Sequence, residues 1–101
     1  MVKQGELWWA MVDKRRPVLV LTRDEAIGVL NSVLVAPGTR TLRKIASEVV
    51  AGTDEGLPAE TAFSFDNLTT LPKTMLRQRI GELGVAGRAR MCAAVGAVLD
   101  C

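Results

Sequence analysis

The fold is decided close to the N-terminus, where the chain contains Leu7-Trp8-Trp9-Ala10-Met11-Val12, then Asp13-Lys14-Arg15-Arg16, then Pro17-Val18-Leu19-Val20-Leu21-Thr22. Both apolar runs are short and rich in aromatic and β-forming residues, which favours strands over helices. Because they are apolar throughout, we expect strands that are covered on both faces of a sheet. Only 13–16 separate them, so the two strands should form an antiparallel hairpin.

Further short elements follow, separated by turn residues. One or two turns of helix are expected over 24–31 after an Asp24 cap, and then a strand over 32–36 that ends at the turn signal Pro37-Gly38. A polar, basic stretch leads to a strand at about 47–51 and a loop over 52–60. Alternation over 61–66 predicts a half-buried strand. The segment 68–71 favours β structure, 72–75 favours a helical turn, and 76–83 predicts a brief strand only at its end.

A helix is predicted over 85–99, because Met91, Val95, Val98 and Leu99 recur on one side at helical spacing. Several short strands followed by one helix indicate an α+β fold with a strongly curled antiparallel sheet or small β-barrel. The 101 residues fit a single domain over 1–101, and 49% of them are hydrophobic, enough for a buried core.

The composition excludes several classes of site. The chain has no His, which excludes an imidazole base, a Ser-His-Asp triad and a His-ligated metal. The two cysteines, Cys92 and Cys101, are too few for a zinc site; we expect free thiols in a reducing cytosol, with a disulfide between them as the alternative. No targeting segment or membrane-spanning run is apparent, so we expect a cytoplasmic protein that has no membrane partner. We also expect it to bind no metal and no cofactor.

The net charge of +2 conceals a segregated distribution. Residues 1–44 contain eight Lys or Arg against four acids, residues 45–66 contain five acids and no base, and residues 67–101 contain five bases against two acids. One interpretation is an ordinary solvated surface. The other is a basic face that binds a polyanion such as nucleic acid.

Five pieces of the sequence, in this order, resemble the MazF/PemK family of bacterial toxins. They are Gly5-Glu6-Leu7-Trp8-Trp9-Ala10; Arg16-Pro17-Val18-Leu19-Val20-Leu21; Val33-Leu34-Val35-Ala36 leading to Thr39; Asp66-Asn67-Leu68; and Leu76–Leu83 with its Ile80-Gly81, before the terminal helix. The resemblance implies an SH3-like barrel with a C-terminal helix, a homodimer, and a sequence-specific, metal-independent endoribonuclease that cleaves single-stranded RNA. It also implies an antitoxin partner whose disordered tail occupies the RNA groove.

The resemblance places the family's catalytic residues on Arg16 and Thr39. In metal-independent cleavage the RNA's own 2′-OH attacks phosphorus, giving a 2′,3′-cyclic phosphate and a 5′-OH. A guanidinium suits the negative charge that develops at phosphorus, and a hydroxyl adds one donor. The pKa of free arginine lies far above neutrality, which makes Arg16 a better charge stabiliser than proton donor. The general base stays open among Asp13, Asp24 and Glu25, because none of them has a decisive position. The loop over 13–16 is also much shorter than in most members of the family, so the resemblance does not extend to a carboxylate supplied by that loop.

Binding residues are predicted around this pair. Phosphate contacts are expected from Lys14, Arg15, Arg40, Arg43 and Lys44, and Asn67 is the candidate reader of a base edge, with a solvated charged face as the alternative for each. Trp8 and Trp9 are adjacent in a strand and should point to opposite faces, one into the core and the other toward the dimer surface or the RNA groove.

Two other functions fit the same fold. One is a toxin that poisons DNA gyrase by binding, largely through its C-terminal residues; the retained pair of Arg16 and Thr39 argues against it. The other is a nucleic-acid-binding barrel without catalytic activity, which would have the basic face but would not cleave.

Overall fold

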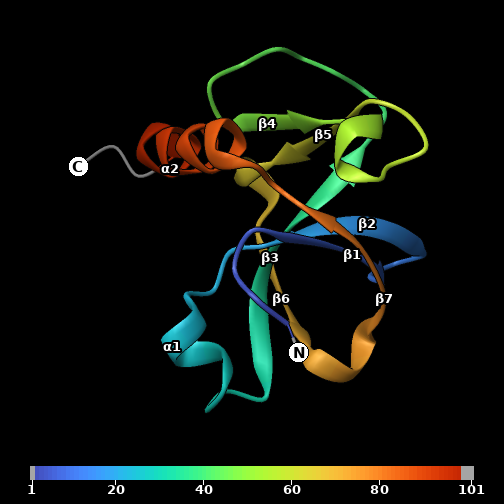
Figure 1. Cartoon of the computed structure of the whole chain (residues 1–101), viewed down its shortest axis with the longest axis vertical. Coiled ribbons are helices and arrows are strands. Elements are labelled where there is room, and N and C mark those ends of the chain that lie inside the picture. The colour runs from blue at the N-terminus through green and yellow to red at the C-terminus, as the bar shows by residue number, and fades with distance from the viewer. Residues whose placement is uncertain (1, 99–101) are drawn as a thin grey trace.

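The computed structural model describes residues 2–98, which form one curled antiparallel sheet and a long C-terminal helix (Figure 1). The strands are β1 (Glu6–Met11), β2 (Arg15–Val20), β3 (Ser32–Thr39), β4 (Glu48–Ala51), β5 (Thr61–Ser64), β6 (Thr69–Pro72) and β7 (Leu76–Glu82). The helices are α1 (Asp24–Ile27) and α2 (Val85–Val98), with short 3-10 helices η1 (Thr53–Glu55), η2 (Phe65–Asn67) and η3 (Lys73–Met75).

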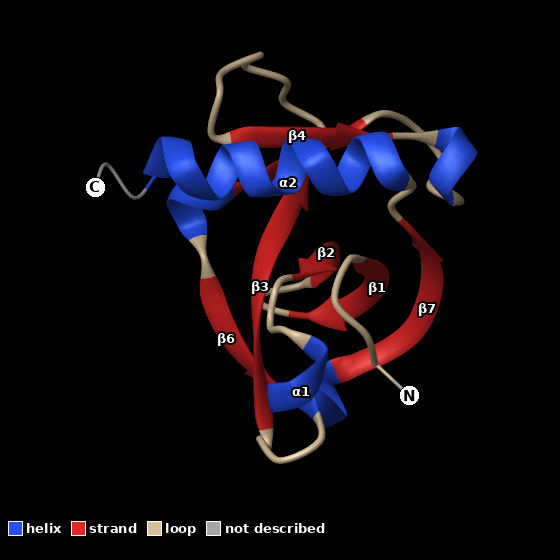
Figure 2. Ribbon diagram, turned by 60° about the vertical axis from the view of Figure 1, so that its left-hand side comes forward, coloured by secondary structure: helices blue, strands red, loops and turns tan. Residues whose placement is uncertain are grey.

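The sheet has the order β4-β5-β3-β2-β1-β7, and β6 pairs with the first half of β3. All of these pairs are antiparallel. The sheet curls strongly, and α2 crosses one end of it beside β4 (Figure 2). The predicted fold, a curled antiparallel sheet with a C-terminal helix, is therefore confirmed.

The β1–β2 hairpin is antiparallel, as predicted, with Trp8 opposite Val18 and Met11 opposite Arg15. Its connection is shorter than the predicted 13–16, because β1 ends at Met11 and β2 already begins at Arg15. Alternate residues of the hairpin enter two different cores. Leu7 and Leu19 belong to the core beneath α2, whereas Ala10 and Val18 belong to a second core shared with β6, β7 and α1. The prediction that these strands are covered on both faces is correct.

The prediction that the third strand stops at Pro37-Gly38 is wrong, because β3 continues to Thr39. Pro37 pairs with Val18, and Gly38 pairs with Phe63 of β5. A Cβ atom on Gly38 would lie 2.7 Å from Thr61 Cγ2 and 3.0 Å from the Pro17 carbonyl oxygen. This glycine allows two strands to approach closely, and no turn occurs there.

Other boundaries also differ from the sequence prediction. Strand β7 spans the whole of 76–82, because it pairs along β1. Strand β5, which lies between β3 and β4 in the sheet, is buried on both faces and not half-buried as predicted. On α2 the buried residues are Gly87, Met91 and Ala94, so Val95, at 39% exposure, is not part of the core face. The Val98 side chain, Leu99 and Cys101 lie outside the described residues, and Cys92 is an exposed free thiol. Neither helix in residues 2–98 is long and apolar enough to cross a bilayer.

The contact at Gly38 predicts a large cost for adding one methyl group. We expect Gly38→Ala to lower the free energy of unfolding by about 1–3 kcal/mol, because the Pro17 backbone cannot move aside without disturbing β2. Gly28→Ala is the matched control, since Gly28 has helical φ −66° and a Cβ there meets nothing within 4 Å. Urea unfolding of both variants measures the difference, and equal midpoints would contradict this account.

Candidate active site

Arg16 and Thr39 meet where β2 begins and β3 ends. The β2–β3 ladder ends where Val18 pairs with Pro37, two residues away from both Arg16 and Thr39, and the two side chains line the same two pockets. Because side chains alternate along a strand, Arg16 lies on the same face as Val18, and Thr39 on the same face as Val35. Both of these valines are fully buried. Arg16 and Thr39 therefore lie at the outer edge of the second core, and both are attached to strand backbone.

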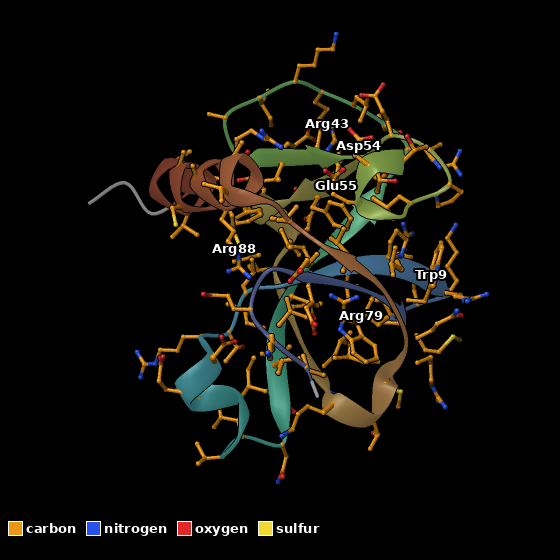
Figure 3. All side chains as sticks on the ribbon, in the orientation of Figure 1. Trp9, Arg43, Asp54, Glu55, Arg79 and Arg88 are labelled. Atoms are coloured by element: carbon orange, nitrogen blue, oxygen red, sulfur yellow. The ribbon has the colours of Figure 1, made fainter. Side chains whose placement is uncertain are left out.

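Two pockets of about 330 Å³ each lie on either side of this pair. Arg16, Gly38 and Thr39 line both of them. Pocket A is completed by Trp9, Lys14, Arg15, Pro17, Arg40, Leu57, Pro58 and Thr61. Pocket B is completed by Val12, Asp13, Pro37, Arg43, Ser64 and Asn67. In Figure 3, Trp9, which lines pocket A, lies at the outer end of the β1–β2 hairpin, and Arg43, which lines pocket B, lies above β4.

The Arg16 side chain is held by Asp13 from the same hairpin. Arg16 Nε donates to Asp13 Oδ1 at 2.8 Å, and its Nη2 donates to Oδ2 at 3.2 Å. Asp13 Oδ1 also accepts the Lys14 backbone N–H at 2.9 Å. Since a guanidinium has five N–H groups, the Nη1 amino group remains available to a second anion. The short hairpin thus orients the arginine and leaves one of its edges open.

This ion pair changes the titration of both groups. The hydrogen bond from Arg16 holds the pKa of the Asp13 carboxyl well below its ordinary value of 3.8, and the same bond raises the pKa of Arg16. A carboxylate with a lowered pKa is a weak base. Arg16 in turn keeps its positive charge at every physiological pH.

Most of the predicted binding residues gather around the pair. Lys14, Arg15 and Arg40 line pocket A, and Arg43 and Asn67 line pocket B. Lys44 lines neither pocket: its backbone N–H binds Glu48, and its φ of 56° turns the chain there.

The three candidate bases also separate in space. Asp13 lines pocket B, whereas Asp24 and Glu25 belong to α1 and line neither pocket. Asp24 instead accepts the backbone N–H of Gln4 at 2.7 Å. In residues 2–98 no group of three His, Cys, Asp or Glu side chains converges as metal ligands would.

The two tryptophans point to opposite faces, as predicted. Trp8 packs against the second core, and its indole N–H donates to the buried Glu6 carboxylate at 3.1 Å. Trp9 lines pocket A, where the Arg15 guanidinium lies 4.8 Å from the centre of its ring. Trp9 is therefore the aromatic surface of the site.

Sequence reasoning missed the residues that reach the site from 57–64. Leu57, Pro58 and Thr61 line pocket A, and Ser64 lines pocket B. They arrive there because β5 pairs with the end of β3, which is a long-range contact. The alternating pattern of 61–66 predicted the strand but not its pairing with β3.

The curled sheet and the basic side chains around Arg16 and Thr39 define a small β-sheet protein with a basic, two-pocket candidate site at its strand ends. The model of the PemK-like, MazF-like toxins of type II toxin–antitoxin systems matches residues 3–99. The chain belongs to this family. The resemblance found in the sequence is thus confirmed.

Individual relatives are similar over nearly the whole chain. The probable endoribonuclease MazF5 of Mycobacterium tuberculosis is 39% identical, over 97% of this chain and 93% of that protein. The endoribonuclease MazF3 of the same species is 38% identical over 90% and 88%. The solved Mycobacterium tuberculosis toxin MazF-mt6 superposes with a TM-score of 0.89 at 37% identity, covering 94% of this chain and 96% of that one.

The Asp13–Arg16 pair predicts a specific titration behaviour. Asp13 should stay ionised as the pH falls through the ordinary aspartate range. The ion pair should therefore contribute fully to folding stability above that range, and its contribution should be lost as the pH falls to the lowered pKa of Asp13. A ¹³C NMR titration of the Asp13 carboxyl measures this pKa. Arg16→Ala should raise it toward the ordinary value, and Lys14→Ala, which removes a neighbouring charge but keeps the pair, should change it little. A pKa that is unaffected by Arg16→Ala would contradict the assignment.

Proposed function

We propose that the protein is the toxin of a type II toxin–antitoxin system and a metal-independent, sequence-specific endoribonuclease that cleaves single-stranded RNA. The observation that supports it most strongly is the meeting of Arg16 and Thr39 between two pockets lined by basic side chains. Relatives that are 38–39% identical are named endoribonucleases, which agrees with this chemistry.

The reaction is an internal transfer at phosphorus. The 2′-oxygen of the RNA attacks the adjacent phosphorus as its proton is lost, the bond to the 5′-oxygen breaks, and that oxygen gains a proton. The products are a 2′,3′-cyclic phosphate and a 5′-hydroxyl. Because the nucleophile belongs to the substrate, the protein has to place the phosphate and stabilise the extra negative charge on its oxygens.

Arg16 and Thr39 would supply that stabilisation. The open Nη1 edge of Arg16 faces the phosphate while Asp13 holds the other edge. Thr39 adds a hydroxyl donor from the opposite strand. One such donor is worth about 10²–10³ in rate. Asp13 orients Arg16 in this scheme and does not accept the proton, since its pKa is lowered.

The pockets would hold the nucleotides on either side of the cleaved bond. Trp9 in pocket A offers a face on which a base can stack, and Asn67 in pocket B offers an amide to a base edge. Lys14, Arg15, Arg40 and Arg43 would contact phosphates. Lys44 is the weakest of the predicted contacts, because it lies outside both pockets.

The same surface would receive the antitoxin. A disordered, acidic antitoxin tail would compete with RNA for the basic side chains, which links inhibition to occupation of the pockets. We also propose that the toxin is a homodimer. Exposed apolar side chains occur on several parts of the chain, Val85 and Leu30 among them, and pairing of two copies would cover some of this surface.

Cleavage should persist when metals are removed. We expect purified protein to cut mixed-sequence single-stranded RNA in EDTA and to leave 2′,3′-cyclic phosphate and 5′-hydroxyl ends, identified by mass spectrometry and end-labelling. Activity that disappears with EDTA and returns with magnesium would overturn the mechanism. RNA binding without any cleavage would favour a non-catalytic barrel, and inhibition of gyrase without cleavage would favour the gyrase-poisoning alternative.

Arg16 should act on the chemical step more than on binding. We expect Arg16→Ala to lower the single-turnover cleavage rate by at least about 10² while RNA affinity falls much less, because the other basic residues remain. Arg16→Lys should restore little, since an ammonium lacks the two-edged geometry. Thr39→Ala should lose less than Arg16→Ala, because a neutral donor is weaker. Equal losses of affinity and rate in Arg16→Ala would make Arg16 a phosphate anchor only.

A further inference from the structure

Glu48, the first residue of β4, is a buried carboxylate beside the candidate site. Its side chain is only 1% exposed. Oε1 accepts the backbone N–H of Arg43 at 3.0 Å and that of Lys44 at 3.2 Å. Lys44 has a φ of 56°, in the left-handed region, and this turn directs two successive N–H groups at one anion. The carboxylate therefore fixes the backbone of the loop at 43–44.

The other oxygen of Glu48 has a different environment. Within residues 2–98, Oε2 is the buried side-chain polar atom without a hydrogen-bond partner. The nearest charge is the Arg43 Nη1 nitrogen at 3.7 Å, which is too long for a hydrogen bond. A buried carboxylate that is only partly satisfied is costly for the fold. A carboxylate that is kept at position 48 despite this cost indicates a role for Glu48 other than stabilising the fold.

The position of Arg43 indicates what this role of Glu48 is. Arg43 lines pocket B together with Arg16, Thr39 and Asn67, and its side chain is 56% exposed. Glu48 also reaches the wall of the same pocket through the backbone, since it pairs with Ser64 across β4 and β5. One buried carboxylate thus contacts both the main chain and the guanidinium of a residue that lines the site.

We propose that Glu48 is a positioning residue for RNA binding: it fixes the loop at 43–44 and holds the Arg43 guanidinium at pocket B, where it meets an RNA phosphate. The identity of the ligand rests on the proposed function. A side chain that is fixed before binding loses less conformational entropy when it contacts the phosphate. Glu48 itself does not touch the RNA.

The substitution Glu48→Gln separates this role from a simple charge effect. The glutamine side chain would keep an oxygen for the two backbone N–H groups, but an amino group would face Arg43 in place of Oε2. If Glu48 acted only through its negative charge, neutralising it would strengthen binding of a polyanion. If it positions Arg43, neutralising it weakens binding.

The test is a double-mutant cycle on RNA affinity, using a mixed-sequence single-stranded RNA with 2′-O-methyl groups that prevent cleavage. We expect Glu48→Gln to weaken binding about three- to tenfold and to lower the slope of affinity against salt by about one, the same change that we expect for Arg43→Ala. In the Arg43→Ala background Glu48→Gln should have no further effect. The matched control is Arg40→Ala, which removes a cation of the same loop that does not contact Glu48, and there the two losses should add.

Two results would overturn the proposal. Tighter binding of Glu48→Gln in both backgrounds would reduce Glu48 to a repulsive charge, and equal weakening in both would make it a general structural residue. A second measurement needs no variant: ¹⁵Nε relaxation in the wild type should find the Arg43 side chain more ordered than that of Arg40. Equal mobility would contradict the positioning role.

The two proposals fail separately. Wild-type protein that neither binds nor cuts RNA would refute the proposed function. Wild-type protein that binds RNA, combined with additive losses in the Arg43 cycle, would refute only the role of Glu48.

Discussion

Gly38 lies against Thr61, Phe63 and the Pro17 carbonyl, with no room for a Cβ atom. This contact lets β5 pair with the last two residues of β3, while β2 and β6 pair with earlier residues of the same strand. The end of β3 therefore lies between β2 and β5. Thr39, the pocket walls from 57–64 and the start of β2 all meet there because one residue has no side chain.

Carboxylates support guanidinium groups on both sides of the site. Asp13 holds Arg16 from within the hairpin, and Glu48 lies 3.7 Å from the guanidinium of Arg43, which lines pocket B. The two pairs differ in environment: the Asp13 side chain is largely exposed, whereas that of Glu48 is buried. An exposed pair costs little to form and can exchange partners readily. A buried carboxylate is much harder to displace and fixes the chain around it.

The sequence predicted the local elements well and the long-range contacts poorly. The apolar hairpin around Trp8 and Trp9 has a strong short-range pattern, so its two antiparallel strands and the opposite directions of the tryptophans followed from it, whereas its register required the structure. Pro37-Gly38 was misjudged because the same dipeptide that favours a turn in isolation also permits close strand packing, and only the neighbour decides between them. The face of α2 was partly wrong for a related reason: Gly87 and Ala94, not Val95, lie against the sheet.

Among the site residues, Arg16 and Thr39 were predicted through the resemblance, and their neighbours on the hairpin followed from proximity in sequence. Ser64, Thr61 and Glu48 were not predicted as part of the site, because their relation to it depends on pairings between β3, β4 and β5. No local pattern encodes such pairings. The basic cluster was visible as a segregation of charge, but its division between two pockets required the fold.

The placement of Arg16 and Thr39 at strand ends has an evolutionary consequence. Arg16 and Thr39 lie on strands whose side chains enter the two cores, whereas much of the surrounding lining comes from connecting segments at 12–14, 40–43 and 58. Connecting segments accept substitutions and insertions at small cost to the fold. A descendant of this chain can therefore acquire a new ligand preference through substitutions in those segments, while Arg16 and Thr39 keep their places on the strands.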